Sequence, residues 1–251
     1  MQHQINTPAW PRIGTVGLSG LLVTFGAALS EPANRAALAF RAAVERQDWP
    51  EVSETSTSLV STFLSVDLAI TSAAEMKERL TDLLGTQNWF DAPLPDGRTL
   101  WHVPTVYGTD LAPQLEEAAK VAGLDPDEAI RQLSSARVRV LTIGFAPGQP
   151  YMGELGKTWD IPRQTGLTPR VPGGALIVAI RQLIIFTAAS PTGWRHIGQT
   201  AFETFRPAAC QPFALSPGDE LTFPSVSRDD LLHIQRQDTS GNGGAQAEQI
   251  T

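Results

Sequence analysis

The stretches VRVLTIGFAPGQPYMG at residues 138–153 and GGALIVAIRQLIIFT at residues 173–187 decide the fold of this chain. Both combine short runs of aliphatic and β-branched residues with glycine and proline. Four such runs follow Arg137, and turn residues separate them: Val138–Ile143, Ala175–Ile180, Leu183–Thr187 and Glu220–Phe223. Short strands that turns interrupt this often favour a β-barrel or a β-sandwich.

The first part of the chain follows a different pattern. Leu21–Phe25 predicts a strand, and Ser30–Pro32 predicts the start of a helix. A second strand is expected over Leu59–Leu64. Ser72 and Glu75 then have the spacing of a capping box at the start of a second helix. The order strand, helix, strand, helix predicts a small α/β unit.

Two domains and a tail follow from these patterns. We expect an α+β protein with an N-terminal α/β domain over residues 1–92 and a β-barrel domain over residues 93–238. The turn-forming residues Asn88–Gly97 carry the boundary. Two short helices should precede the barrel strands, the second with Asp125 as its N-cap and proline at the next position. Residues 239–251 have little to bury and are expected to be a flexible tail.

Composition restricts the class of partner. The 251 residues are 42% hydrophobic and carry a formal net charge of −7, which argues against nucleic acid or an anionic membrane as the main partner. No basic segment leads into an apolar run at the N-terminus, and the apolar stretch Val16–Leu29 is too short to span a bilayer. Cys210 is the single cysteine, so no intramolecular disulfide can form. A cytoplasmic protein is expected.

The segment from Gly144 to Gly198 concentrates turn residues and positive charge. It holds nine of the 21 glycines and six of the 19 prolines, which predicts long ordered loops. Five basic residues face only two acidic ones, a local charge of +3. An anionic ligand would explain this excess, and pairing of the basic side chains with carboxylates or loop carbonyls would explain it equally well.

Ordered motifs in this part of the chain resemble the KipI family. They read GFAPGQPYMG at 144–153, PR at 162–163, TPRVPGG at 168–174, SPTGWRHIGQT at 190–200 and PGD at 217–219. The family includes the kinase inhibitor KipI, the B subunit of 5-oxoprolinase and allophanate hydrolase subunit 1, and its motifs recur in the carboxyltransferase region (subdomains C and D) of urea carboxylases. The resemblance spans nearly the whole chain. It implies a cyclophilin-like β-barrel that acts with a homologous barrel subunit.

The chain also departs from the family pattern. Gln149 and Glu154 stand within its first motif, and residues 179–187 match the family's Ala-Gly-x-Gln-Thr-Gly-Ile-Tyr-Pro with isoleucine or leucine in place of two glycines and a threonine. Gln182 is retained. Because glycine serves where the backbone takes a positive φ or approaches a ligand closely, these replacements predict a changed pocket.

The leading hypothesis from this resemblance is a subunit of an ATP-dependent 5-oxoprolinase, which converts 5-oxo-L-proline to L-glutamate. The partner would be a homologous subunit of the KipA type, equivalent to the C subunit of 5-oxoprolinase, and ATP would act in the assembled complex without a tightly bound cofactor. The alternatives are a subunit of the allophanate hydrolase or urea carboxylase type, and a KipI-like inhibitor of a sensor histidine kinase. An exposed apolar patch over Leu183–Phe186 would favour the inhibitor.

Five residues are candidates for substrate binding. Arg163 and Arg170 follow prolines and could hold a carboxylate or phosphate bidentately. Tyr151 could donate its hydroxyl to a carbonyl or pack beneath the loop, and Gln182 could bind an amide or be a satisfied structural glutamine. His196 is either a general base or a packing residue. Pro147, Gly148, Gly174 and Gly193 are expected to form the loop scaffold.

Other catalytic signatures are missing from the sequence. It contains no nucleotide-binding Gly-x-x-x-x-Gly-Lys-Ser/Thr loop, and Gly17–Gly20 is not a nucleophile elbow. The four histidines lack the spacing of a zinc site, so no metal is expected. With no nucleophile beside an evident base, the isolated chain is predicted to have little activity, and its partner would supply the missing groups.

Overall fold

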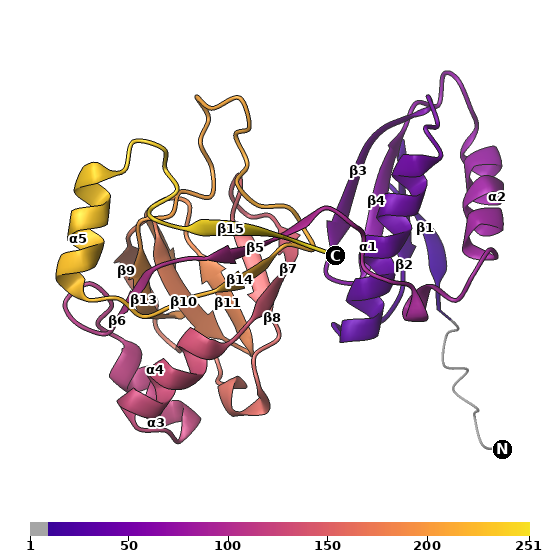
Figure 1. Cartoon of the computed structure of the whole chain (residues 1–251). Helices are drawn as coiled ribbons and strands as arrows, with labels where there is room; N and C mark the ends of the chain where they lie inside the picture. Colours follow the sequence, from indigo (N-terminus) through magenta and orange to yellow (C-terminus); the bar gives the residue numbers. More distant parts are fainter. Residues whose placement is uncertain (1–9) are drawn as a thin grey trace, which may run out of the picture. The chain divides into compact units, whose positions relative to one another are not determined.

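The structure, a computed structural model, describes residues 10–251 and divides after Pro95 into two compact units (Figure 1). The division lies within the turn-forming segment Asn88–Gly97, three residues after the boundary expected at 92. Both units combine helices with strands, and the second contains a large curled sheet, which confirms the α+β class. Within residues 10–251, no helix combines the length and the apolar character that crossing a bilayer demands.

The first unit packs two helices and a short 3-10 turn with an antiparallel sheet of order β1-β2-β4-β3. Phe25, Phe40 and Trp89 form edge-to-face aromatic contacts at the centre of its core. The elements are β1 (Arg12–Val16), β2 (Gly20–Thr24), α1 (Glu31–Arg46), β3 (Val52–Ser58), β4 (Ser61–Val66), α2 (Ala73–Leu84) and η1 (Trp89–Asp91).

The helix starts confirm the capping signals of the sequence. Ser30 is the N-cap of α1, and Ser72 and Glu75 form a reciprocal capping box at the start of α2. Asp125 caps α4 by accepting a hydrogen bond of 2.8 Å from the backbone N–H of Glu128. Each cap satisfies an N–H group that a helix start would otherwise leave without a partner, and this explains why these positions could be read from the sequence.

The second unit is built on a long curled sheet of order β15-β5-β14-β7-β8-β11-β10-β13-β6 (Figure 1). β5 and β6 follow each other in the chain but lie near opposite ends of this order, and Thr105 at the start of β6 also bridges Ser225 beyond β14. The sheet therefore curls into a barrel-like surface. Its strands are β5 (Arg98–His102), β6 (Thr105–Tyr107), β7 (Val138–Ile143), β8 (Pro150–Gly153), β10 (Ala175–Ala179), β11 (Gln182–Ile185), β13 (Arg195–Thr200), β14 (Glu220–Thr222) and β15 (Gln246–Ile250).

Helices and a small second sheet cover this surface. The further elements are α3 (Leu115–Ala122), α4 (Pro126–Ser135), η2 (Lys157–Trp159), β9 (Thr168–Val171), β12 (Ser190–Thr192) and α5 (Arg228–Gln237). β9 pairs with β12, and we call this two-stranded sheet and its adjoining loop residues 161–167 and 193–194 the flap.

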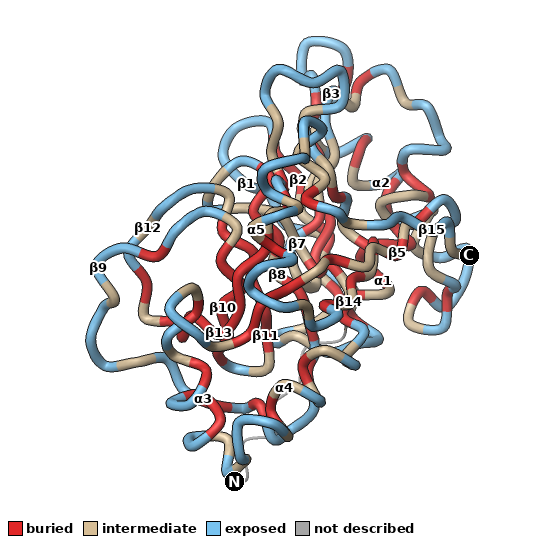
Figure 2. Tube along the Cα trace, turned by 60° about the vertical axis from the view of Figure 1, so that its left-hand side comes forward, coloured by how far each residue is buried: buried red, intermediate tan, exposed pale blue. Residues whose placement is uncertain are grey.

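Both faces of the central strands are buried, as the red strands β10, β11 and β13 in Figure 2 show. Leu176 and Val178 join the barrel core, whereas Ala175 and Ile177 join a second apolar cluster with Trp194 of the flap. This two-sided burial explains the continuous apolar run in the sequence. It also buries Leu183–Phe186, so the exposed patch that would have favoured a kinase inhibitor does not exist.

The expected flexible tail is corrected by the structure. Gln246–Ile250 forms β15 and pairs in register with β5 from Arg98 to His102. Arg98 also donates to the backbone oxygen of Thr251, and the backbone N–H of Gly243 donates to Asp238 over 2.7 Å. The prediction was wrong because it considered only side-chain burial. A ladder of backbone hydrogen bonds orders this strand although its side chains are largely exposed.

The Pro-Gly-Asp motif at 217–219 has a structural explanation. The carboxylate of Asp219 accepts hydrogen bonds of 2.8 Å from the backbone N–H groups of Thr99 and Ser216, which ties the turn to β5. Burial raises the pKa of Asp219, and the two N–H donors and Arg98 oppose this rise. The motif therefore fixes β5 beside β14.

The isoleucine that replaces a family glycine occupies a left-handed turn. Ile180 and Arg181 connect β10 to β11 with φ values of 44° and 63°. A two-residue hairpin turn with positive φ at both positions usually contains glycine or asparagine. The surroundings hold this turn in place, since the N–H groups of Ile180 and Arg181 donate to the backbone oxygens of Ile161 and Trp159.

Candidate functional site

Three of the predicted substrate-binding residues lie on one face of the large sheet. Tyr151, Ile184, Ile177 and His196 form one row of paired residues across β8, β11, β10 and β13. Gln182 lies in the neighbouring row, opposite Gly153 and Ala179. Because adjacent strands are about 4.8 Å apart, Tyr151 and His196 are separated by roughly 14 Å. They share a face, but they do not converge on one small group.

Tyr151 is linked to Arg163 through Trp194. The rings of Tyr151 and Trp194 meet edge to face with centroids 6.4 Å apart, and the guanidinium of Arg163 lies 5.3 Å from the centroid of Trp194. The backbone oxygen of Trp194 accepts a hydrogen bond of 3.0 Å from Gln164. These contacts hold the flap against the sheet, and they leave Arg163 exposed above the aromatic pair.

His196 is a buried, neutral histidine. Its backbone N–H donates to the side-chain oxygen of Gln114 over 2.9 Å, and only 4% of the residue is exposed. Burial lowers the pKa of His196, although the neighbouring Gln199 side chain and Gly198 backbone oppose this effect. Its Nε2 atom has no hydrogen-bond partner among the described residues. Both interpretations of His196, as a general base and as a packing residue, stay predictions.

The remaining two candidates differ in their surroundings. Gln182 is buried at the start of β11, with its side chain beside Gly153. Arg170 is exposed on β9 of the flap. The structure therefore brings Arg163 near Tyr151, places Gln182 in the row next to that of Tyr151, and leaves Arg170 apart on the flap. Their proposed contacts with a substrate stay predictions.

Two of the predicted scaffold residues are required to be glycine. Gly174 has a φ of 74°, and a Cβ atom there would lie 2.5 Å from the backbone oxygen of Thr200. Gly148 has a φ of 71°, and its Cβ would lie 2.8 Å from the backbone oxygen of Thr204. Gly193 instead lies within the flap, close to the backbone oxygen of Gln164, and Pro147 is exposed in the β7–β8 loop. Gly148 and Gly174 thus both approach the segment that follows β13.

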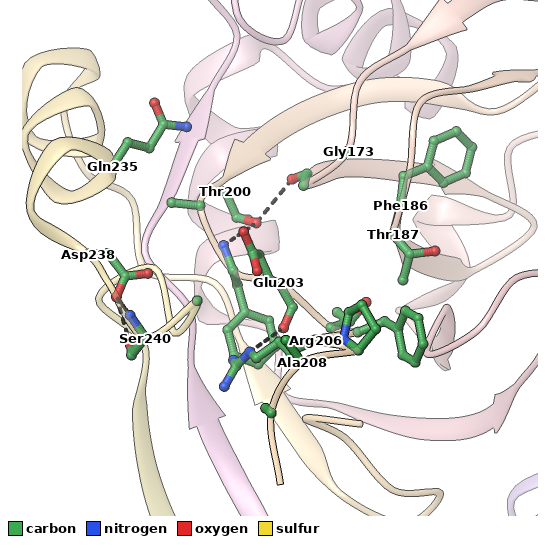
Figure 3. A pocket seen from close by; sticks show the side chains of 18 of the residues that line it. Gly173, Phe186, Thr187, Thr200, Glu203, Arg206, Ala208, Gln235, Asp238 and Ser240 are labelled. Carbon is green, nitrogen blue, oxygen red and sulfur yellow. Dashed lines mark hydrogen bonds between the residues drawn. The ribbon is translucent and has the colours of Figure 1, made fainter. Parts of the chain in front are cut away.

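That segment lines a pocket of about 890 Å³ which the sequence patterns did not predict. Figure 3 shows Phe186 and Thr187 on one side of the pocket, Asp238 and Ser240 on the other, and Glu203 and Arg206 between them. The walls come from the residues just before β10, the residues just after β11, the end of β13 with the loop that follows it, and the end of α5 with the turn that follows it. The lining residues are Gly173, Gly174, Phe186, Thr187, Thr200 to Ala209, Gln235 and Asp238 to Gly241.

The charged residues of this pocket are individually fixed. Arg206 donates from Nε to the backbone oxygen of Glu203 over 3.0 Å, and its guanidinium lies 5.5 Å from the ring centroid of Phe202. Burial acts to raise the pKa of Asp238, but hydrogen bonds from Ser240, Gly243 and Gly241 outweigh it and hold this pKa below its usual value. Asp238 is therefore an ordered carboxylate at neutral pH, and Arg206 is a preoriented donor.

Within residues 10–251, no group of histidine, cysteine and carboxylate side chains has the arrangement of a metal site. Thr187, Thr204 and Arg206 line the pocket, and each also has one side-chain polar atom that is buried away from it without a partner among the described residues. These residues do not form a short sequence motif. The predicted loop residues Gly148 and Gly174 are linked to the pocket only because they pack against residues 200–204.

The chain belongs to the family described as carboxyltransferase domain, subdomain C and D, whose match covers residues 11–215. This match includes the first unit from residue 11 onward, the strands of the second unit from β5 to β13 and the pocket loop, whereas β14, α5 and β15 lie beyond it. This family match, together with the relatives below, confirms the resemblance to the KipI family.

Particular relatives carry a more specific name. The chain is 28% identical over 243 residues to the B subunit of 5-oxoprolinase from Bacillus subtilis (strain 168), and the match covers 91% of this chain and 98% of that protein. It is 34% identical over 140 residues to the B subunit of 5-oxoprolinase from Escherichia coli O157:H7, covering 55% of this chain and 64% of that protein.

Solved structures share the fold. The protein TTHA0988 superimposes with a TM-score of 0.70 at 30% identity, covering 84% of this chain and 40% of that chain. This chain thus spans about two fifths of TTHA0988. Kluyveromyces lactis urea carboxylase superimposes with a TM-score of 0.68 at 17% identity, covering 92% of this chain and 23% of that chain, and this likeness is one of fold alone.

Proposed function

We propose that this chain is a subunit of an ATP-dependent 5-oxoprolinase, which opens 5-oxo-L-proline to L-glutamate and releases ADP and phosphate. The observation that carries the proposal is the match to the Bacillus subtilis protein named as the B subunit of 5-oxoprolinase, which covers nearly the full length of both chains. The two units described above are therefore both included in the relationship.

A second subunit is part of this proposal. Among the described lining residues, the hydroxyl of Ser240 donates to the carboxylate of Asp238 over 2.7 Å, but the lowered pKa of Asp238 makes it a weak base, and the single cation of the pocket is Arg206. In TTHA0988 the matching region occupies 40% of a longer chain, so in that protein further polypeptide accompanies the same fold. We propose a homologous barrel subunit of the KipA type, equivalent to the C subunit of 5-oxoprolinase, as the partner, with ATP bound in the assembled complex in the cytoplasm.

The chemistry of the reaction assigns a task to the basic residues. A lactam resists hydrolysis until its carbonyl oxygen is activated, and phosphoryl transfer from ATP would achieve this. Negative charge then develops on oxygen, and preorganised donors stabilise it. Arg163 and Arg170 are exposed on the flap, where they are proposed to contact a ligand held against the partner.

The experiment that tests the proposal uses the chain together with its operon partners. Purified subunits, alone and combined, are supplied with ATP and 5-oxo-L-proline, and ADP and glutamate are measured. We expect 5-oxoproline-dependent ADP release from the combination and little from this chain alone. Substrate-independent ATP hydrolysis, or the same turnover when this chain is omitted, contradicts the proposal. Replacing 5-oxoproline with allophanate or urea in parallel reactions tests the neighbouring activity.

A further inference from the structure

The flap differs in charge from the rest of the chain. It contains Arg163 and Arg170 but no lysine and no acidic residue. Two of the 19 basic residues and none of the 26 acidic ones therefore lie in the flap, so it carries +2 whereas the rest of the chain, with a total of −7, carries −9. A positive surface on an acidic protein is complementary to a partner that presents negative charge.

The arginines of the flap have no carboxylate partner within the chain. Of the other basic residues between Gly144 and Gly198, Arg181 and Arg195 each pair with a glutamate, over 3.4 Å and 2.9 Å. Arg163 and Arg170 form no ion pair with any residue of the described range 10–251, and both are exposed. Internal pairing therefore accounts for part of the local positive charge and leaves the charge of the flap uncompensated.

An exposed leucine lies beside Arg163. Leu167 is 70% exposed. A Cβ atom placed on Gly193 would lie 3.8 Å from Cδ2 of Leu167 and 3.9 Å from Cβ of Arg163, so both side chains flank this glycine. Arginine beside apolar side chains, without lysine or carboxylates, matches the composition of protein–protein interfaces.

The flap is fixed to the second unit, which gives these side chains defined positions. Trp194 is 5% exposed and packs into the apolar cluster beneath the flap. Gln114 donates to the side-chain oxygen of Gln164 over 2.9 Å, and Arg195 donates to the backbone oxygen of Pro162 over 2.7 Å. Figure 2 shows that the segments around β9 and β12 are nevertheless largely exposed. A rigid exposed surface loses little conformational entropy when a partner binds.

We propose that the flap is the surface on which the partner subunit docks. The complementary face of the partner is acidic around an apolar hollow: Leu167 enters the hollow, and Arg163 and Arg170 lie opposite the carboxylates. The choice of the barrel subunit as the occupant rests on the proposed function. The charge, the exposure and the rigidity of the flap describe the face that this subunit must present.

A second copy of this chain fits the flap less well. The acidic residues of the chain all lie outside the flap, so a second copy would have to bind head to tail. Its own flap would stay free, and contacts of this kind form open chains unless the rotation closes a ring. A different subunit with an acidic face covers the flap in a single contact.

Calorimetric titration of the full chain with the purified barrel subunit from its operon tests this inference. Leu167→Ser should weaken association about tenfold, because an apolar anchor is lost. The double variant Arg163→Glu with Arg170→Glu should weaken it about tenfold or more at low salt. Added salt should weaken the wild-type complex and have less effect on the double variant.

Control variants lie at exposed positions outside the flap. Phe213→Ser removes an apolar side chain that is 52% exposed, and Arg236→Glu reverses an exposed charge on α5. Both should bind the partner with wild-type affinity, and melting temperatures verify that every variant is folded. Wild-type affinity in Leu167→Ser and in the double variant, equal weakening by the controls, or no binding of the partner by the wild-type chain overturns the inference.

Sedimentation velocity of the chain alone tests the competing occupant. We expect a monomer at low salt, both for the wild-type chain and for Leu167→Ser. Self-association that Leu167→Ser abolishes would make a second copy the occupant of the flap and would overturn the inference.

Turnover measurements distinguish docking from the proposed function. Leu167→Ser should lower 5-oxoproline-dependent ATP hydrolysis at low partner concentration and restore the wild-type rate when the partner is in excess, because Leu167 contributes to docking and not to chemistry. Full turnover at every partner concentration overturns the inference and leaves the proposed function standing. Conversely, docking that depends on the flap without any turnover overturns the proposed function and leaves the docking surface standing.

Discussion

The left-handed turn at Ile180 and Arg181 yields a prediction about stability. At ordinary positions alanine is more stable than glycine by about 0.5–1 kcal/mol, because glycine loses more backbone freedom on folding. At Ile180, with φ of 44°, the order should reverse. A left-handed conformation costs an L-residue about 1–2 kcal/mol, and glycine avoids this cost. Subtracting the entropic penalty leaves Ile180→Gly more stable than Ile180→Ala by about 0.5–1 kcal/mol.

Comparing these two variants cancels the loss of the isoleucine side chain, which is 43% exposed in the native protein. Urea unfolding of both variants gives the difference directly, and thermal scans should show glycine melting roughly 2–4 °C higher for each kcal/mol gained. Ala188→Gly is the control at an exposed residue with ordinary φ, where glycine should destabilise. If Ile180→Ala equals or exceeds Ile180→Gly in stability, the turn is not strained as argued.

Further predictions concern packing, pH and the C-terminal strand. Gly174→Ala should lower the free energy of unfolding by about 2–4 kcal/mol in urea titrations, because the Cβ atom of the alanine would overlap the backbone oxygen of Thr200. An unchanged free energy of unfolding would refute this close approach. The free energy of unfolding should fall as pH drops below 6.5 and level off below the lowered pKa of His196, because the unfolded chain binds the proton first. The slope of this fall has a limit of about 1.4 kcal/mol per pH unit, and His196→Gln should reduce it. An unchanged slope in His196→Gln would exclude His196 as its source. Deleting residues 239–251 should lower the melting temperature because β5 loses its partner strand, whereas a tail without structure could be removed without effect.

Sequence reasoning succeeded where a local pattern fixes local structure. The caps at Ser30, Ser72 and Asp125 were readable because a side chain a few residues away satisfies the helix start. The apolar runs of β10 and β11 were readable because both of their faces are buried. These signals need no knowledge of distant residues.

Strands that lack an apolar pattern escaped prediction. β13 reads RHIGQT and is buried along its whole length, with Arg195 paired to Glu117 and the backbone N–H of His196 donating to Gln114. β15 reads QAEQI and is held by backbone pairing. Both depend on partners far away in the chain, and no local signal announces them.

The candidate site was only partly accessible for the same reason. Gly148 and Gly174 were identified as scaffold residues, and they do require glycine. The pocket that they support combines segments near residues 174, 187, 204 and 240. Spacing along the sequence cannot reveal such a juxtaposition.

We propose that this chain works as one subunit of a 5-oxoproline-cleaving complex. The most direct measurement is 5-oxoproline-dependent ADP and glutamate production by the reconstituted subunits, with this chain added or left out. We expect turnover that requires both this chain and its barrel partner. Turnover by the other subunits alone, by this chain alone, or by no combination of them would contradict it.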